Sequence, residues 1–117
     1  MSKDDLPPDR AVAALAALAH EHRLGLHRLL VERGPDGLAA GTIAERLGLA
    51  PSSLTFHLQH LLRAGLITQR RLGRQLIYAA DFAAMNALLA YLTRNCCGRE
   101  TACLPVAAAH LPDRRTA

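Results

Sequence analysis

Two short amphipathic segments on either side of a glycine constrain the fold most strongly. Residues 42–47 have the pattern of a short helix, and Gly48 ends it. The segment that follows begins at Pro51, which suits a first helical turn, and stops at Gly65, which suits the left-handed residue just past a helix end. A helix, a glycine-containing turn and a second amphipathic helix together predict a helix-turn-helix.

The second of these helices has an apolar face and a polar face. Its leucines share the spacing of one helix face: Leu54, Leu58, Leu61 and Leu62. We assign the opposite, polar face to Ser52, Ser53, Thr55, His57, Gln59, His60 and Arg63. We expect the leucine face to pack into the core and the polar face to be free for recognition.

A basic hairpin is predicted directly after this helix. Residues 66–71 and 75–78 are short runs that favour β-strands, and Gly73 between them can supply the turn. A hairpin in this position is a wing. The predicted fold class is therefore mainly α with a small β-hairpin, a winged helix-turn-helix in the order ααααββα.

Positive charge is concentrated on the same part of the chain. From Arg46 to Ala80 there are five arginines and no Asp or Glu, so this segment carries +5 while the whole chain carries a formal +4. A solvated basic face would be the simpler interpretation of an isolated charge run. Next to a helix-turn-helix, however, these arginines lie on the helix and hairpin that would face a DNA backbone. There they can neutralise phosphates and release the counterions bound to them. We predict binding to double-stranded DNA.

The remaining sequence predicts three more helices and a dimer. The first opens at Pro8 or Asp9, the second ends at Gly34–Pro35, and the last follows a cap at Ala80 or Asp81. The last carries a long apolar stripe, made of Phe82, Met85, Leu88, Leu89 and Leu92. A stripe this long exceeds the needs of a small core, so we expect a homodimer through the first and last helices.

The domain organisation follows from these elements. We expect a flexible N-terminus over residues 1–8, a DNA-binding and dimerisation domain over 9–94, and a metal-binding segment with a tail over 95–117. The longest apolar run, Ala11–Ala19, is too short to span a bilayer, which predicts a cytoplasmic protein without a membrane partner. No phosphate loop, catalytic acid pair or nucleophile-base set is recognisable, so we do not expect an enzyme.

All three cysteines lie within eight residues near the end of the last helix: Cys96, Cys97 and Cys103. Adjacent cysteines on a continuous helix point about 100° apart, but Asn95 and Gly98 favour a helix end that would let the thiols converge. Three thiolates select soft ions and suit pyramidal As(III) or Sb(III). A closed zinc site would need a fourth ligand such as His110. Zinc or cadmium sensing, a redox switch and incidental thiols remain as alternatives for the cysteines, and a winged-helix protein-interaction module is the alternative to a DNA-binding regulator.

These residues resemble the ArsR/SmtB family of winged-helix metalloregulatory repressors over residues 9–94. The motifs are Arg23-Leu24-x-Leu26-x-x-Leu29-Leu30 and His57-Leu58-x-x-Leu61-x-x-Ala64-Gly65-Leu66-Ile67. The resemblance implies a homodimeric repressor that leaves its operator when a metal binds. It also implies DNA contacts by Ser52, Ser53, Thr55, His57 and Gln59, with Arg71 and Arg74 in the wing near phosphates.

The resemblance also bears on the inducer. Many arsenic sensors of the family carry a Cys-x-Cys pair before the recognition helix, where this chain has Ala39 and Gly41, and the zinc site of the last helix is missing because Asp81 has no histidine partners there. The cysteine arrangement instead resembles arsenite sensors with a trithiolate site after the last helix. The histidines at 20, 22 and 27 match no familiar ligand spacing, and we interpret them as surface or inter-helix residues.

Overall fold

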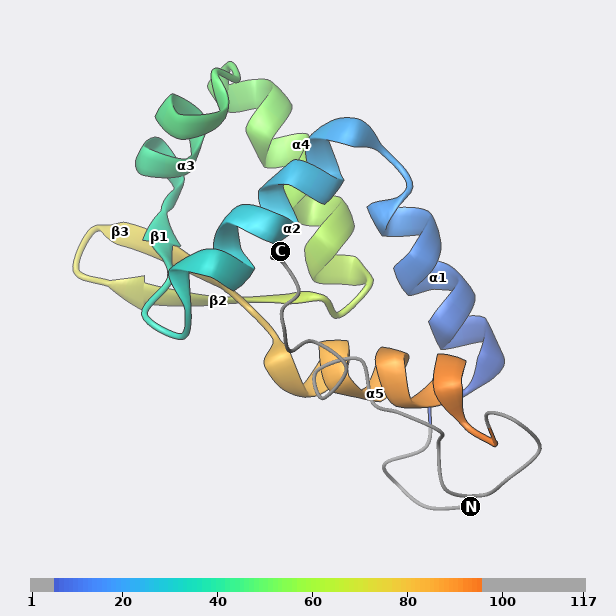
Figure 1. Ribbon diagram of the computed structural model, residues 1–117. Coiled ribbons are helices and arrows are strands. Elements are labelled where there is room, and N and C mark those ends of the chain that lie inside the picture. The colour runs from blue at the N-terminus through green and yellow to red at the C-terminus, as the bar shows by residue number, and fades with distance from the viewer. Residues whose placement is uncertain (1–5, 96–117) are drawn as a thin grey trace, which may run out of the picture.

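A computed structural model describes residues 6–95, and over this range the chain forms five helices and three strands (Figure 1). The elements are α1 (Pro8–Leu18), α2 (Glu21–Arg33), β1 (Leu38–Ala39), α3 (Ala40–Leu47), α4 (Pro51–Arg63), β2 (Ile67–Leu72), β3 (Gln75–Ala80) and α5 (Phe82–Thr93). This order confirms the predicted winged helix-turn-helix. The one element that the prediction lacked is β1.

The strands form one antiparallel sheet in the order β1-β3-β2. Strands β2 and β3 are joined by a tight turn in which Gly73 has φ +64°, as the hairpin prediction required. Strand β1 adds a third member, with Leu38 opposite Tyr78. Just before β1, Gly37 has φ +73° and lies so close to β3 that a Cβ at this position would overlap the Tyr78 carbonyl oxygen. The short third strand ties the wing to the helical part of the molecule.

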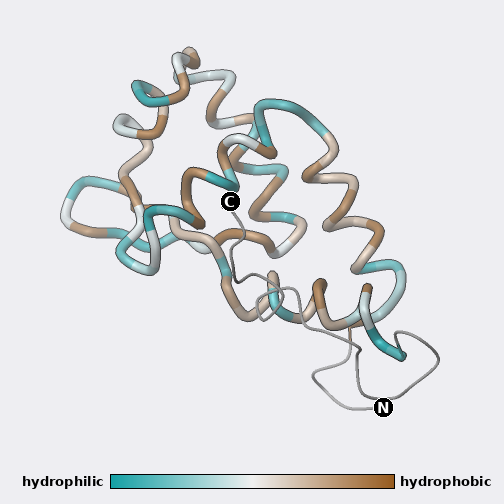
Figure 2. The backbone as a smooth tube through the Cα atoms, in the orientation of Figure 1, coloured by the Kyte–Doolittle hydropathy of each residue, from teal (hydrophilic) through white to brown (hydrophobic). Residues whose placement is uncertain are grey.

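The core lies where α2, α3 and α4 meet the inner ends of the wing strands. Its most deeply buried side chains are Leu26, Leu30, Ile43, Leu61 and Leu66, and Figure 2 shows hydrophobic positions recurring along the helices. The predicted leucine face of α4 is confirmed for Leu54, Leu58 and Leu61. This packing fixes the orientation of α4, because three of its turns are anchored in the core.

Helices α1 and α5 contact each other at one end of the molecule, away from the wing (Figure 1). Small side chains of α1 (Ala11, Ala14 and Ala17) turn inward, which allows other helices to approach α1 closely. Large apolar side chains of both helices remain exposed instead: Val12 at 65%, Leu15 at 43%, Leu89 at 38% and Leu92 at 53%. We call these four residues the apolar end face.

Helix α5 begins and ends with recognisable local signals. The Asp81 carboxylate accepts a hydrogen bond of 3.0 Å from the Ala84 N–H, as its predicted capping position requires. After Thr93 the chain leaves the helix, and Asn95 has the left-handed φ of +58°. Thus α5 ends before Cys96 in the sequence. None of the helices between residues 6 and 95 has the length and apolar character needed to cross a membrane.

Candidate nucleic-acid interface

The turn between α3 and α4 sets the position of the recognition helix. Gly48, with φ +66°, ends α3 in a left-handed cap, and the Leu49 N–H donates to the Ala44 carbonyl at 3.0 Å. Two residues later Pro51 opens α4. Ile43 is fully buried and fixes α3 against the core. Helices α3 and α4 therefore have the helix-turn-helix arrangement that the glycine and proline predicted.

The outer face of α4 presents small polar side chains. Ser52, Ser53, Thr55 and Gln59 are all exposed. The Thr55 hydroxyl donates to the Pro51 carbonyl at 3.0 Å, so its proton is already used, whereas its oxygen can still accept. Hydroxyl and amide groups on one exposed helix face are suited to hydrogen bonds with base edges and phosphate oxygens.

His57 does not belong to this face. Its side chain is only 6% exposed and lies against His20 and His22 from the α1–α2 corner. Placing it on the exposed side was wrong, because position 57 follows Leu54 by three residues and so shares the inward stripe with Leu54, Leu58 and Leu61. The candidate DNA-binding surface therefore consists of the exposed residues of α4 and the wing, without His57.

The histidines of α4 add little positive charge to the helix. Burial first, and then the neighbouring His20 and Arg23, lower the pKa of His57. Desolvation and then Arg23 also lower the pKa of His60. Both rings are thus mainly neutral at neutral pH. The positive charge beside the polar face comes instead from arginines.

Three exposed arginines line the wing: Arg70, Arg71 and Arg74. Arg70 donates to the Asp36 carbonyl at 2.7 Å and so joins β2 to the loop before β1. Arg71 lies opposite Leu76 in the hairpin register, and Arg74 lies in the turn. Both predicted wing arginines therefore lie on the outer half of the hairpin, where they are accessible to a phosphate backbone.

The candidate inducer site is not visible in this structure. Cys96, Cys97, Cys103 and His110 lie outside the described residues. Ala39 and Gly41, at the positions where the resemblance would place a Cys-x-Cys pair, line an open hollow between α3 and the wing together with Arg74 and Gln75. None of the described residues that line this hollow is a cysteine. These lining residues therefore provide no Cys-x-Cys ligands for a soft metal ion.

Known proteins with the same arrangement are regulators. A family described as a helix-turn-helix domain matches residues 18–70. The HTH-type transcriptional regulator YgaV of Escherichia coli (strain K12) is 32% identical over 89 residues, which cover 76% of this chain and 88% of YgaV. The structure of HlyU from Vibrio cholerae N16961 has a TM-score of 0.59 and 33% identity, and the match covers 79% of this chain and 97% of HlyU.

The chain belongs to the ArsR/SmtB family. Another similar structure, at 26% identity and a TM-score of 0.59, is the homodimeric winged helix-turn-helix DNA-binding domain of Mb0332 from Mycobacterium bovis; the match covers 72% of this chain and 73% of that domain. The similar proteins are DNA-binding transcriptional regulators and not enzymes. This agrees with the prediction of DNA binding and with the prediction that the chain is not an enzyme. The helix-turn-helix and wing described above are the parts of the chain that carry this function.

Sequence reasoning missed one grouping of potential ligands. His20 and His22 lie next to His57, although 35 residues separate His22 from His57 in the chain. The spacing of His57 from Leu54 could have indicated that His57 lies on the buried face of α4. Which residues it would meet there depends on how α4 packs against α2, and no spacing in the sequence encodes that contact.

Proposed function

We propose that the protein is a dimeric transcriptional repressor that releases its operator when trivalent arsenic or antimony binds to Cys96, Cys97 and Cys103. The observation that carries the DNA-binding part is the exposed polar face of α4 beside the arginine-bearing wing, in a segment without a single Asp or Glu. The protein acts on duplex DNA in the cytoplasm. Its reading residues are Ser52, Ser53, Thr55 and Gln59, and Arg71 and Arg74 contact phosphates.

The apolar end face of α1 and α5 supports the dimer. Four large apolar side chains, each at least 38% exposed, gather on two helices that contact each other. Mb0332, which shares this fold, is homodimeric. A twofold axis through this end would place the two α4 helices in successive major grooves about one helical turn, ~34 Å, apart. The operator is then a near-palindrome.

The inducer assignment rests on the cysteines. Three cysteines fall within eight residues, and the helix before them ends at Thr93, followed by a left-handed Asn95. Three thiolates suit As(III) or Sb(III), whereas a closed zinc site would need a fourth ligand. Ligand binding next to α5 would alter the contact between protomers and hence the spacing of the α4 helices.

A thiol redox switch at the same cysteines is the second candidate. One similar structure, at 35% identity, is reduced HlyU from Vibrio cholerae, a description that states a redox condition for that protein. Under this alternative, oxidation would join two of the three cysteines and release DNA without any metal. Arsenite and oxidant therefore distinguish the two candidates.

The test is fluorescence anisotropy of the reduced protein on labelled DNA from its own upstream promoter, titrated with arsenite, with zinc and with peroxide. We expect arsenite to weaken DNA binding by about tenfold or more and zinc to have little effect. The matched control replaces all three cysteines by serine. This variant should bind DNA as the parent does and ignore arsenite.

Two outcomes would overturn the inducer assignment. If the serine variant still releases DNA on adding arsenite, the ligands are other residues. If only peroxide releases the parent protein, the cysteines form a redox switch. Failure of the parent to bind any duplex DNA would instead contradict the DNA-binding function itself.

A further inference from the structure

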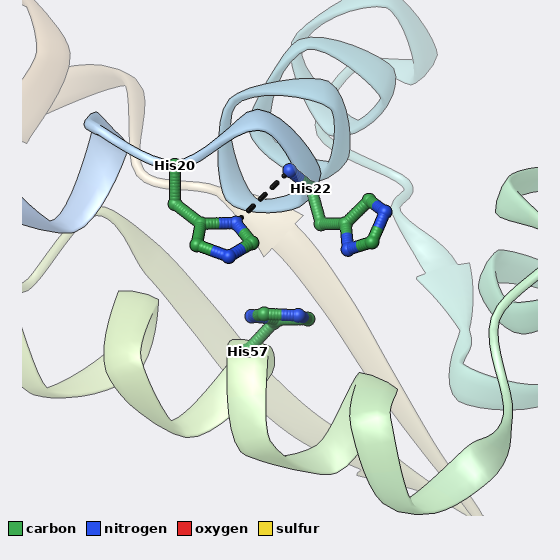
Figure 3. Close-up of side chains that lie close together, drawn as sticks. All are labelled: His20, His22 and His57. Carbon is green, nitrogen blue, oxygen red and sulfur yellow. Dashed lines mark hydrogen bonds between the residues drawn. The ribbon is translucent and has the colours of Figure 1, made fainter.

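Three histidines from two separate parts of the chain meet on the inner side of α4. His20 caps the start of α2, His22 lies in the first turn of α2, and His57 lies in the middle of α4 (Figure 3). Their ring centroids are 4.8 Å (His20 to His57), 5.5 Å (His22 to His57) and 5.5 Å (His20 to His22) apart. One nitrogen from each ring lies within 4.8 Å of the other two.

The buried ring nitrogen of His57 points to a ligand. His57 is only 6% exposed, and its fully buried Nδ1 has no hydrogen-bond partner among residues 6–95. A buried polar atom without a partner is costly, so such atoms are normally satisfied by protein, water or an ion. Figure 3 shows the His57 ring edge-on, beneath the rings of His20 and His22. A metal ion bound at Nδ1 would satisfy this atom.

The chemistry of the three rings selects the class of ion. Neutral imidazole nitrogens bind borderline divalent ions such as Zn²⁺, Co²⁺, Ni²⁺ and Cu²⁺, and three histidines with an open fourth position form a common zinc arrangement. His20 Nδ1 already accepts the cap hydrogen bond from the His22 N–H at 3.1 Å, so His20 would bind through Nε2. That cap bond also holds the ring in place, as partners of metal-binding histidines usually do.

Modest side-chain movement completes the site. Nitrogens at about 2.0–2.1 Å from one tetrahedral ion lie closer together than 4.8 Å, so the rings must converge on binding. His22 is exposed and can rotate, whereas His20 can shift only as far as its cap bond allows and His57 is held by its burial. Arg23, half-buried and held at the corner by its 2.6 Å hydrogen bond to the Ala17 carbonyl, adds positive charge that weakens the binding of a cation. This charge argues for a site of modest affinity.

We propose that His20, His22 and His57 form a second metal site, which binds a borderline divalent transition-metal ion and ties the α1–α2 corner to the middle of α4. The site shares no residue with the cysteine cluster and would bind a different class of ion. Its effect on DNA binding rests on the proposed function, because α4 is the reading helix there. Metal binding itself does not depend on that function.

The test uses the full chain with all three cysteines changed to serine, so that thiols cannot bind the probe ion. Co²⁺ is titrated in the absence of DNA, and its visible absorption reports nitrogen coordination; Zn²⁺ is then added to displace it. We expect one Co²⁺ per chain, displaced by Zn²⁺, and a thermal midpoint that Zn²⁺ raises by several degrees.

The decisive variant is His22→Ala, because His22 is exposed and its loss leaves the core intact. We expect at least about a tenfold loss of Co²⁺ affinity and no Zn²⁺-dependent rise of the midpoint. The matched control is His60→Ala, which removes a histidine three residues from His57 on the same helix but outside the cluster. This control should bind Co²⁺ with the same affinity as the cysteine-free protein from which it is made.

Equal Co²⁺ affinity in the His22→Ala variant and its parent would overturn the proposal, as would the absence of a Co²⁺ spectrum in the parent. DNA binding by the metal-free proteins is measured separately by anisotropy. If metal binds as expected but no variant binds DNA, the proposed function fails while the metal site stands. If the proteins bind DNA but not Co²⁺, the metal-site proposal fails while the proposed function stands.

Discussion

His27 and His57 are the two buried polar residues of the described core, and each has a buried ring nitrogen without a hydrogen-bond partner. For His57 the nearby His20 and His22 provide a reason. In the part of the chain that the structure describes, His27 belongs to no such cluster, and burial first and Arg28 second lower its pKa. A neutral histidine held in an apolar core makes the stability of the fold depend on pH.

This dependence has a defined sign. Because the pKa of His27 is lower in the folded chain than its ordinary value of 6.5, the unfolded chain takes up a proton first as the pH falls. The stabilising contribution is complete above the unfolded pKa and decreases as the pH drops below it. We expect the thermal midpoint of the parent to fall between about pH 7.5 and about pH 5.5.

The variant His27→Leu should flatten this fall, since it removes a buried group that titrates and leaves His57 in place. Thermal unfolding followed by circular dichroism, in buffer with a chelator, measures the effect. His22→Leu, an exposed histidine on the same helix, is the control and should follow the parent. An equally steep fall in the His27→Leu variant would show that His27 does not carry this dependence.

The cap of α5 gives a second prediction at the level of one residue. Asp81→Ala removes the acceptor of the Ala84 N–H and should lower the free energy of unfolding by about 1 kcal/mol. Asp81→Asn keeps an acceptor and should lose only part of that amount. Urea denaturation measures both variants. A change in Asp81→Ala no larger than that in Asp81→Asn would contradict the cap.

The helices and the hairpin could be predicted from the sequence because their signals are local. Gly48, Pro51 and Gly65 marked the limits of α3 and α4, and Gly73 marked the turn of the wing. Strand β1 could not be found in this way. It is two residues long and exists only because Leu38 and Ala39 pair with β3, about 40 residues further along the chain. A contact between distant residues leaves no period in the sequence.

The reading role assigned to α4 makes a prediction about specificity. Gln59 is exposed on the outer face, and a glutamine there is suited to bidentate hydrogen bonds with adenine in the major groove. Gln59→Ala should cost about 1–3 kcal/mol against the preferred operator and reduce discrimination at one base pair in each half-site. Alanine keeps the helix intact.

Binding to a set of operators with single base-pair changes measures this loss. Arg71→Gln is the contrasting variant, because loss of a phosphate contact should weaken binding to all sequences by a similar factor. If Gln59→Ala also weakens all sequences equally, Gln59 contacts the backbone and does not read bases.

At the scale of the molecule, α1 and the wing lie on opposite sides, and α5 runs below them (Figure 1). The proposed dimerisation through α1 and α5 would leave α4 and the wing free to contact DNA. The apolar stripe of the last helix indicated a dimer, but the sequence did not show which side chains of α1 remain exposed. Val12 and Leu15 turn outward only because the alanines of the same helix pack against the core.

The substitution Val12→Glu tests this arrangement. It places a charge in the centre of the proposed interface and should weaken the dimer by at least about 2 kcal/mol. Leu72→Glu introduces the same charge at an equally exposed leucine on the wing and should leave the dimer intact. Sedimentation equilibrium gives the dissociation constants. Dimers of equal strength in both variants would place the interface elsewhere.

The most direct test of DNA binding by α4 and the wing is the salt dependence of affinity for duplex promoter DNA. The logarithm of the association constant should fall steeply and linearly with the logarithm of salt concentration, by about 0.9 for each phosphate neutralised. Changing Arg71 and Arg74 to Gln should reduce the slope by about 0.9 per lost contact. Arg28→Gln, on α2 where Arg28 pairs with Glu32, should leave the slope unchanged. Salt-independent binding, or equal slopes in all three proteins, would contradict the account.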